Sequence, residues 1–216
     1  MALPRFLVSS VALLCFIGFV GHSKAWSAPI GKTLFISCSA CHGQAGEGNA
    51  AIGAPNIAGV DAWYLERQLS NFSSGIRGAT PGDTFGAQMR GAVALLKSDA
   101  ERSAVAAYIA SLPKTKSAAL APVKAKADLA NGSTQFNAIC SSCHASHGRG
   151  NQALGAPNLV ALDPVYMERQ ITAFRSGARG AHKDDKWGAQ MRVGAGMLPD
   201  SKSVRDVIAY IGTLKP

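Results

Sequence analysis

Two five-residue motifs bring thiols and an imidazole together at a spacing that suits a metal-containing group. Both have the form Cys-x-x-Cys-His, and they span residues 38–42 and 140–144. One such motif alone could be half of a zinc site or a redox-active cysteine pair. In an exported protein the four cysteines could also form two disulfides. The histidine that directly follows each pair argues for a different chemistry.

The two motifs belong to a duplication. At an offset of 102 residues the sequence aligns on itself without a gap, pairing residues 38–112 with 140–214, which indicates two copies of one domain. Two thiols three positions apart can form thioether bonds to the vinyl groups of one haem, while the next histidine binds its iron. The duplication therefore predicts two covalently bound haem c groups. The residues predicted to hold them are Cys38, Cys41, His42, Cys140, Cys143 and His144.

The duplication also selects a second iron ligand in each copy. Of five methionines only Met89 and Met191 occupy equivalent places, each 47 residues after its histidine and within the sequence Gly-Ala-Gln-Met-Arg. A methionine thioether opposite histidine is an iron ligand typical of haem electron carriers. We therefore predict that Met89 binds the iron of His42 and that Met191 binds the iron of His144. Met197 is the other candidate in the second copy, but a leucine stands at its place in the first.

Helical periodicity surrounds these residues. Apolar side chains recur at i, i+3, i+4 and i+7 over 105–112 and its counterpart, which predicts an amphipathic helix at the end of each copy. Segment 63–72 and its counterpart predict another helix, closed by a glycine. A third is expected just before each cysteine pair, around 31–37 in the first copy. No segment alternates as a strand does, so we predict an all-α fold of two tandem domains, each wrapped around one haem.

Composition divides the chain into four parts. Residues 1–25 have one basic residue near the start and an apolar run over 6–20, which is typical of a cleavable signal peptide; an uncleaved membrane anchor is the alternative. Residues 113–127 are rich in Pro, Ala, Lys and Ser and form the predicted linker. The predicted domains occupy 26–112 and 128–216, and export would place them in the periplasm.

Charge gives a weaker indication. The formal net charge is +9, yet the basic residues are scattered and form no nucleic-acid-binding motif. This pattern favours a solvated surface, or a docking face for an acidic redox partner, over a nucleic-acid interface. We expect no nucleic acid and no small-molecule substrate, and contact with a membrane only through partner proteins unless the leader is retained.

Together these motifs resemble class I cytochrome c domains, and their tandem arrangement is similar to periplasmic dihaem cytochromes of the c4 type. The likeness covers nearly the whole mature chain, including a methionine loop with a leucine seven residues on and a last helix that ends Ala-Tyr-Ile. In that family a proline after the haem motif offers its carbonyl oxygen to the haem-binding histidine. Carried over, the resemblance assigns this contact to Pro55 for His42 and to Pro157 for His144.

The first helix departs from the family pattern. The aromatic residue expected four positions before the first cysteine is Phe136 in the second copy, whereas Phe35 lies only three before Cys38. Two explanations stay open: the helix is shifted, or Leu34 replaces the phenylalanine in its contact with Tyr108.

The sequence does not decide between two roles for two pairs of equivalent arginines. They could neutralise haem propionates, because a guanidinium matches a carboxylate geometrically, or they could be solvated surface side chains. These residues are Arg77, Arg90, Arg179 and Arg192.

An iron held between histidine and methionine has no vacant position for oxygen, peroxide or substrate, and the thioether favours the ferrous state. We therefore predict an electron carrier and not an enzyme. The resemblance implies transfer between a quinol-oxidising complex or dehydrogenase and a terminal oxidase. One alternative is a permanent dihaem cytochrome subunit of a dehydrogenase complex. Another is a dihaem peroxidase, although the paired methionines argue against the open iron that it needs.

Overall fold

The computed structural model describes residues 24–115 and 127–214 of the 216-residue chain. The predicted leader lies almost entirely outside these residues, as does most of the predicted linker. No helix in the described part is long and apolar enough to span a membrane. The described residues form two helical domains and contain no β-strand. One isolated β-bridge pairs two loop residues in each domain. The predicted all-α architecture of two tandem domains is confirmed.

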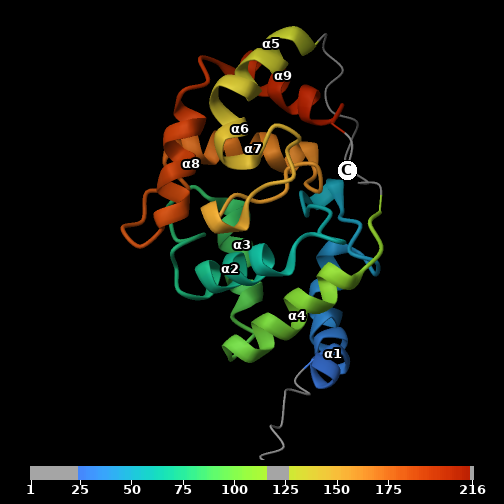
Figure 1. The fold of residues 1–216 in the computed structure, drawn as a ribbon. Coiled ribbons are helices and arrows are strands. Elements are labelled where there is room, and N and C mark those ends of the chain that lie inside the picture. The colour runs from blue at the N-terminus through green and yellow to red at the C-terminus, as the bar shows by residue number, and fades with distance from the viewer. Residues whose placement is uncertain (1–23, 116–126, 215–216) are drawn as a thin grey trace, which may run out of the picture.

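The described part of the first domain consists of four α-helices and one 3-10 turn (Figure 1). The elements are α1 (Lys24–His42), η1 (Ala50–Ile52), α2 (Ala62–Ser73), α3 (Thr84–Val93) and α4 (Asp99–Ser111). α4 begins at a capping box, because the Ser98 hydroxyl accepts from the Glu101 N–H and the Glu101 carboxylate accepts from the Ser98 N–H. The expected first helix is longer than predicted, since α1 continues through both cysteines to His42.

The second domain repeats this plan (Figure 1). Its elements are α5 (Leu129–Gln135), η2 (Phe136–Cys140), α6 (Ser141–His144), η3 (Gln152–Leu154), α7 (Pro164–Ser176), α8 (Lys186–Gly196) and α9 (Ser201–Ile211). The consecutive elements α5, η2 and α6 correspond to α1. α7 starts with a proline at its first position, directly after Asp163, whose carboxylate accepts from the Tyr166 N–H.

The first and last helices of each domain cross at a glycine. A Cβ atom on Gly31 would collide with the carbonyl oxygen of Ala104 in α4 and would lie 2.8 Å from the Cβ of Tyr108. In the second domain, Gly132 approaches the backbone of Asp206 in the same way. These glycines let the two helices pack closely enough for the aromatic contacts that lie one turn further along.

A pair of aromatic rings lies beside each crossing. Phe35 packs on Tyr108 with ring centroids 5.4 Å apart, and Phe136 packs on Tyr210 with ring centroids 5.5 Å apart. Both phenylalanines are buried and belong to the apolar core of their domain. The alternative in which Leu34 replaces Phe35 is therefore wrong.

A π-helical segment, η2, accounts for the irregular spacing of these phenylalanines. The cysteines and histidines of the two copies pair at an offset of 102, whereas Phe35 and Phe136, like Gly31 and Gly132, pair at 101. The second copy thus has one extra residue between phenylalanine and cysteine. η2 spans this interval, and its wider turn takes up the extra residue, so both ends of the helical rod keep equivalent contacts.

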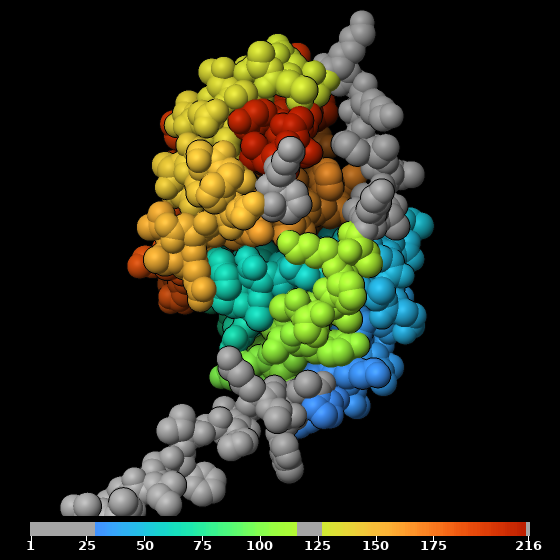
Figure 2. Space-filling model, turned by 45° about the vertical axis from the view of Figure 1, so that its right-hand side comes forward, coloured from blue at the N-terminus to red at the C-terminus, as the bar shows by residue number. Residues whose placement is uncertain are grey.

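The two domains pack directly against each other, as Figure 2 shows for the blue-to-green first domain and the yellow-to-red second domain. Side chains of α2 reach into the second domain: Arg67 donates a hydrogen bond to the Gly155 carbonyl. In return, Arg169 of α7 donates to the Gly53 carbonyl. The contacts of one domain are thus repeated by the other, as expected when two copies of one fold meet about an approximate two-fold axis.

We predict that Gly31→Ala destabilises the protein, because the added methyl group would force α1 away from α4. Overpacking of this kind costs about 1 to 3 kcal/mol, which thermal unfolding measures as a lower Tm. The matched control is Gly91→Ala in α3, where an added Cβ would have no neighbour within 4 Å. That substitution should be neutral or stabilise by up to about 1 kcal/mol. Equal Tm values for Gly31→Ala and wild type would contradict the close helix crossing.

Candidate haem-binding sites

The histidines of the two motifs stand at helix ends and are held by backbone carbonyls. His42 ends α1 and His144 ends α6, and both rings are buried. The Nδ1 atom of His42 lies 2.9 Å from the carbonyl oxygen of Pro55, and His144 has the same contact with Pro157 at 2.9 Å. Because a carbonyl oxygen only accepts, Nδ1 carries the proton and Nε2 keeps a free lone pair. Each ring is thus fixed in the tautomer that binds a metal through Nε2.

Burial also sets the charge of these rings. It disfavours the imidazolium and lowers the pKa of His42 and of His144 below the ordinary histidine value, although the hydrogen bond to proline acts in the opposite direction. Both imidazoles are therefore neutral at pH 7. A neutral imidazole is the form that serves as an iron ligand.

The thiols of the two motifs do not match a redox-active pair. All four are free of disulfides; Cys41 and Cys143 are exposed, and Cys38 and Cys140 are half-buried. Burial raises the pKa of Cys38 and raises that of Cys140 to about 11. Redox cysteine pairs depend instead on a lowered thiol pKa, which makes the thiolate available. These thiols therefore favour a structural attachment, in which Cys38 and His42 lie one helical turn apart on the same face.

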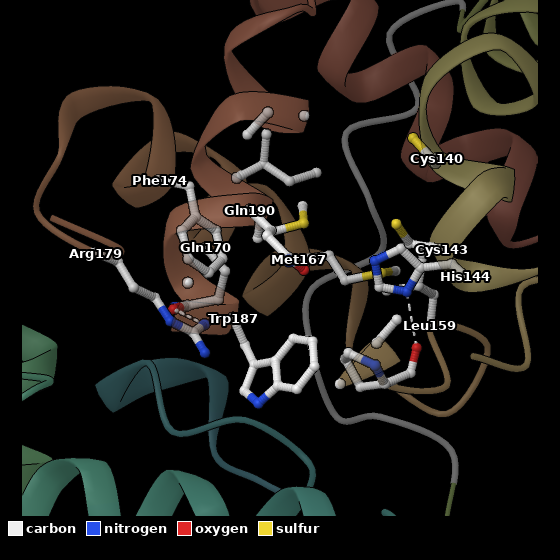
Figure 3. A pocket seen from close by; sticks show the side chains of 18 of the residues that line it. Cys140, Cys143, His144, Leu159, Met167, Gln170, Phe174, Arg179, Trp187 and Gln190 are labelled. Atoms are coloured by element: carbon white, nitrogen blue, oxygen red, sulfur yellow. Dashed lines mark hydrogen bonds between the residues drawn. The ribbon is translucent and has the colours of Figure 1, made fainter. Parts of the chain in front are cut away.

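A largely apolar cavity in the second domain brings the predicted groups together (Figure 3). Cys140, Cys143 and His144 line it from η2 and α6. Met191 lines it from α8. Met197, the other candidate methionine, is 60% exposed and is not among the lining residues. The apolar part of the wall is made by Ile139, Leu154, Leu159, Leu162, Met167, Ile171, Phe174, Ala195, Leu198, Val207 and Ile211.

Both predicted methionine ligands lie in helices and not in loops. Met89 lies in α3 and Met191 in α8, and both side chains are half-buried. Asp83 and Asp185 cap these helices by accepting, at 2.9 Å, from the N–H group three residues on. The family pattern of a methionine loop is therefore wrong for this chain at the level of secondary structure. The caps give each methionine a fixed place on a helix.

Met167 is a lining residue that the repeat did not select. It lies in α7, is buried, and faces the same cavity as His144 (Figure 3). Its counterpart in the first copy is Leu65, so the duplication treats the position as apolar filling. Because Met167 occurs in only one copy, the sequence gives no reason to consider it as an iron ligand. Its place in the cavity wall is what makes it a candidate.

The domain interface contains a buried polar cluster with approximate two-fold symmetry. Arg77 donates to Gln68 of its own domain at 2.9 Å and to Gln170 of the other at 2.8 Å. Arg179 likewise donates to Gln170 at 2.9 Å and to Gln68 at 2.6 Å. Two guanidiniums thus share two amide oxygens. Arg179, Gln68 and Gln170 also line the cavity, so the cluster borders the second haem-binding site.

The cluster creates a strongly positive environment. Burial works to raise the pKa of Tyr166, yet the guanidiniums of Arg77 and Arg179 lower it to about 7. Arg77 also donates a hydrogen bond to the Tyr166 hydroxyl at 3.1 Å. Both arginines donate to the amide oxygens of Gln68 and Gln170, and Tyr64, Tyr166 and Asp185 raise the pKa of Arg179 despite its burial. Guanidinium groups match carboxylates geometrically, so this pair is a candidate for haem propionates.

The remaining arginines differ from this pair. Arg77 and Arg179 are buried, whereas Arg90 and Arg192 are exposed on α3 and α8. The exposed pair therefore matches the solvated role that the sequence left open, and the buried pair does not. The tyrosines and glutamines of the cluster gave no sequence signal of their own, because they read as parts of an ordinary amphipathic helix.

The residues present fit haem c: both domains have paired thiols and a neutral imidazole with a free Nε2, and the second motif also faces a largely apolar cavity bordered by buried arginine and glutamine side chains. The model of the family described as Cytochrome c matches residues 28–113 and 129–215. The chain belongs to the cytochrome c family and contains two of its domains. With one attachment motif in each domain, it carries two covalently bound haem c groups.

Similar proteins point to one type within this family. The chain is 32% identical over 185 residues to the "Thiosulfate dehydrogenase electron acceptor" of Stutzerimonas stutzeri strain A1501, covering 82% of this chain and 80% of the relative. It is 38% identical over 196 residues to the "Cbb3-type cytochrome c oxidase subunit FixP" of Bradyrhizobium diazoefficiens, covering 85% of this chain and 60% of the relative. The crystal structure of reduced recombinant cytochrome c4 from Pseudomonas stutzeri matches with a TM-score of 0.63 and 28% identity, over 87% of this chain and 98% of that one. The chain is a cytochrome c4-like electron carrier.

Proposed function

We propose that each iron is held between a histidine and a methionine of its own domain, His42 with Met89 and His144 with Met191. The observation that carries this proposal is the cavity of the second domain, whose wall contains His144 and Met191 while Met197 is exposed. Equivalent positions in the first domain support the same pairing there. Met167 is the competing thioether on this wall, and the leucine at its place in the first copy speaks against it.

The protein residues have separate tasks in this arrangement. The carbonyls of Pro55 and Pro157 keep Nδ1 protonated, so each histidine presents Nε2 to the iron. The apolar wall excludes water, and the buried arginine pair compensates the propionates. Held by these histidines and methionines, a haem would supply one-electron chemistry, and no ligand position would remain for a substrate.

We infer that the protein moves single electrons between a dehydrogenase or quinol-oxidising complex and a terminal oxidase. The names of two relatives support the two ends of this path, since one is an electron acceptor of thiosulfate dehydrogenase and the other is an oxidase subunit. In this role the protein is not an enzyme and binds neither a small-molecule substrate nor nucleic acid. Its partners are redox proteins.

We further propose export to the periplasm with removal of residues 1–25. The mature chain would then hold domains at 26–112 and 128–216 joined by residues 113–127. The apolar run over 6–20 supports the leader, and the two family matches, which start at 28 and 129, support the boundaries. The N-terminus of the purified protein, read by mass spectrometry, tests this proposal.

A permanent cytochrome subunit is the second candidate function. It is favoured by the relative that is named as an oxidase subunit. Mild purification from the native membrane and periplasmic fractions separates the two: an exchangeable carrier elutes alone, whereas a subunit elutes with its complex at every step.

We predict that the intact protein reacts poorly with carbon monoxide and hydrogen peroxide at neutral pH, because neither iron offers an open position. Absorption spectra of the ferrous protein under carbon monoxide, and a peroxidase assay with an artificial donor, measure this. Heat-opened protein serves as the positive control. Rapid peroxide turnover by the untreated protein would support the peroxidase alternative instead.

We predict that Met191→Ala opens one of the two haems to carbon monoxide and lowers its reduction potential, because removal of the thioether removes the ligand that favours ferrous iron. Spectral titration should show half of the total haem binding carbon monoxide and the other half unchanged.

Two controls separate this effect from packing. Met167→Leu restores the residue of the first copy and should leave both haems closed. Met197→Ala removes an exposed side chain and should leave both closed as well. If Met167→Leu opens a haem while Met191→Ala does not, Met167 is the ligand and the assignment from the repeat is wrong.

A further inference from the structure

Arg67 and Arg169 make reciprocal contacts across the domain interface. The Nη2 atom of Arg169 donates to the Gly53 carbonyl at 2.7 Å, and that of Arg67 donates to the Gly155 carbonyl at 2.7 Å. The two arginines stand at equivalent positions, Arg169 in α7 and Arg67 in α2. The two glycines whose carbonyls accept these hydrogen bonds also stand at equivalent positions, each at the end of a 3-10 turn. Burial lowers the pKa of each guanidinium. Each therefore bears a desolvation cost to reach the other domain, which a solvated surface arginine does not.

The loop that each arginine holds leads directly to the proline of the haem-binding histidine. Gly53 has φ +69°, and the next residue, Ala54, exchanges two backbone hydrogen bonds with Asn49 at 2.8 and 3.0 Å. Pro55 follows and accepts from His42 Nδ1. Only one residue, Ala54, lies between the carbonyl bound by Arg169 and the carbonyl that orients the histidine ring. The second domain repeats this arrangement from Gly155 to Pro157.

Arg169 also contacts the helix that carries the first methionine, whereas the Arg67 guanidinium lies over Trp63 of its own helix, 5.0 Å from the ring centroid. The guanidinium of Arg169 lies 4.1 Å from the ring centroid of Phe85 in α3, four residues before Met89. A Cβ on Gly53 would collide with this ring and lie 2.8 Å from Arg169 Nη1, so glycine, phenylalanine and arginine are in mutual contact. In the second domain, a Cβ on Gly155 would lie 2.5 Å from Trp187, four residues before Met191, and 2.7 Å from Arg67 Nη1.

We propose that Arg67 and Arg169 are crossed positioning residues: each holds the histidine loop of the other domain's haem site, and Arg169 also packs on the methionine helix. This inference rests on the proposed histidine and methionine ligation. A guanidinium suits the task because it donates to a carbonyl in its plane while its face lies over an aromatic ring. Each haem site is thus completed by the other domain. The consequence is specific: loss of Arg169 in the second domain disturbs the first haem, and loss of Arg67 disturbs the second.

The experiment compares Arg169→Met and Arg67→Met in the full-length, haem-loaded protein, because methionine keeps the apolar stem and removes the charged donor. Proton NMR of the ferrous protein resolves the ligand methyl groups, which haem ring currents shift far upfield, and the Nδ1 protons of the haem-binding histidines. Met89→Ala and Met191→Ala assign the methyl signals to their haems. The matched control is Arg175→Met, which changes an exposed arginine of α7 that donates to the Pro199 carbonyl of its own domain.

The expected result is a crossed pattern: Arg169→Met shifts the Met89 and His42 signals, and Arg67→Met shifts those of Met191 and His144. Arg175→Met shifts neither set, and Arg169→Lys, which can still donate to Gly53, returns the signals part of the way. Shifts confined to the domain of the substitution, equal shifts at both haems, or no shift would overturn the proposal.

The same spectra separate this proposal from the one on which it rests. If wild type shows no upfield methyl signals, methionine ligation fails, and the histidine Nδ1 protons still report whether the crossed pattern exists. If wild type shows both methyl signals but the arginine variants give no crossed pattern, only the positioning role fails. Thermal unfolding of each variant confirms that it is folded at the temperature of measurement.

Discussion

The hydrogen bond from each haem-binding histidine to a proline carbonyl is the constraint on which the rest of the site depends. To bring the Pro55 oxygen to 2.9 Å from His42 Nδ1, the chain must turn back on itself within 13 residues. Gly48 makes this possible: it has φ +87°, and a Cβ there would lie 2.6 Å from the Asn56 nitrogen. The turn leaves Nε2 of a neutral, buried ring as the only free ring nitrogen. Ligand geometry, tautomer and charge thus follow from one loop.

The domain interface is a second constraint, because its side chains also belong to a haem-binding site. Arg77, Arg179, Gln68 and Gln170 form a buried cluster in which two guanidiniums share two amide oxygens across the interface. Tyr64, Tyr166 and Asp185 raise the pKa of Arg179 despite its burial, so the described residues themselves support its charge. Because Gln68, Gln170 and Arg179 also line the cavity, the interface and the second haem-binding site share these side chains.

The sequence predicted the parts of the structure that the duplication makes visible. The motif pairs, the end helices and the choice of Met191 over Met197 all follow from equivalent positions. The helices lie where the repeat indicates and Met191 lies in the cavity wall, while its role as an iron ligand stays a prediction. The segments around Met89 and Met191 were expected as loops only because of the family resemblance; aspartate caps and packing make them helical. Local propensity alone does not contain that information.

Other features could not have been predicted from one sequence. A π-helical segment shows itself only as an irregular count of residues between Phe136 and Cys140, and that count alone left two explanations open. The contacts of Arg67 and Arg169 join residues 88 and 116 positions apart, and they involve backbone carbonyls that carry no side-chain signature. Interfaces built from polar side chains and main-chain oxygens follow from three-dimensional packing, which hydrophobic periodicity does not encode.

The most direct test of this account is a spectroelectrochemical titration of the intact protein, followed in the sulfur-to-iron charge-transfer band of the ferric state. The account predicts that all of the haem titrates in two one-electron steps, that both oxidised haems are low-spin, and that the band disappears in proportion to both steps. A high-spin haem, or a band that accounts for only one of the two haems, would contradict the central claim that both irons lie between histidine and methionine.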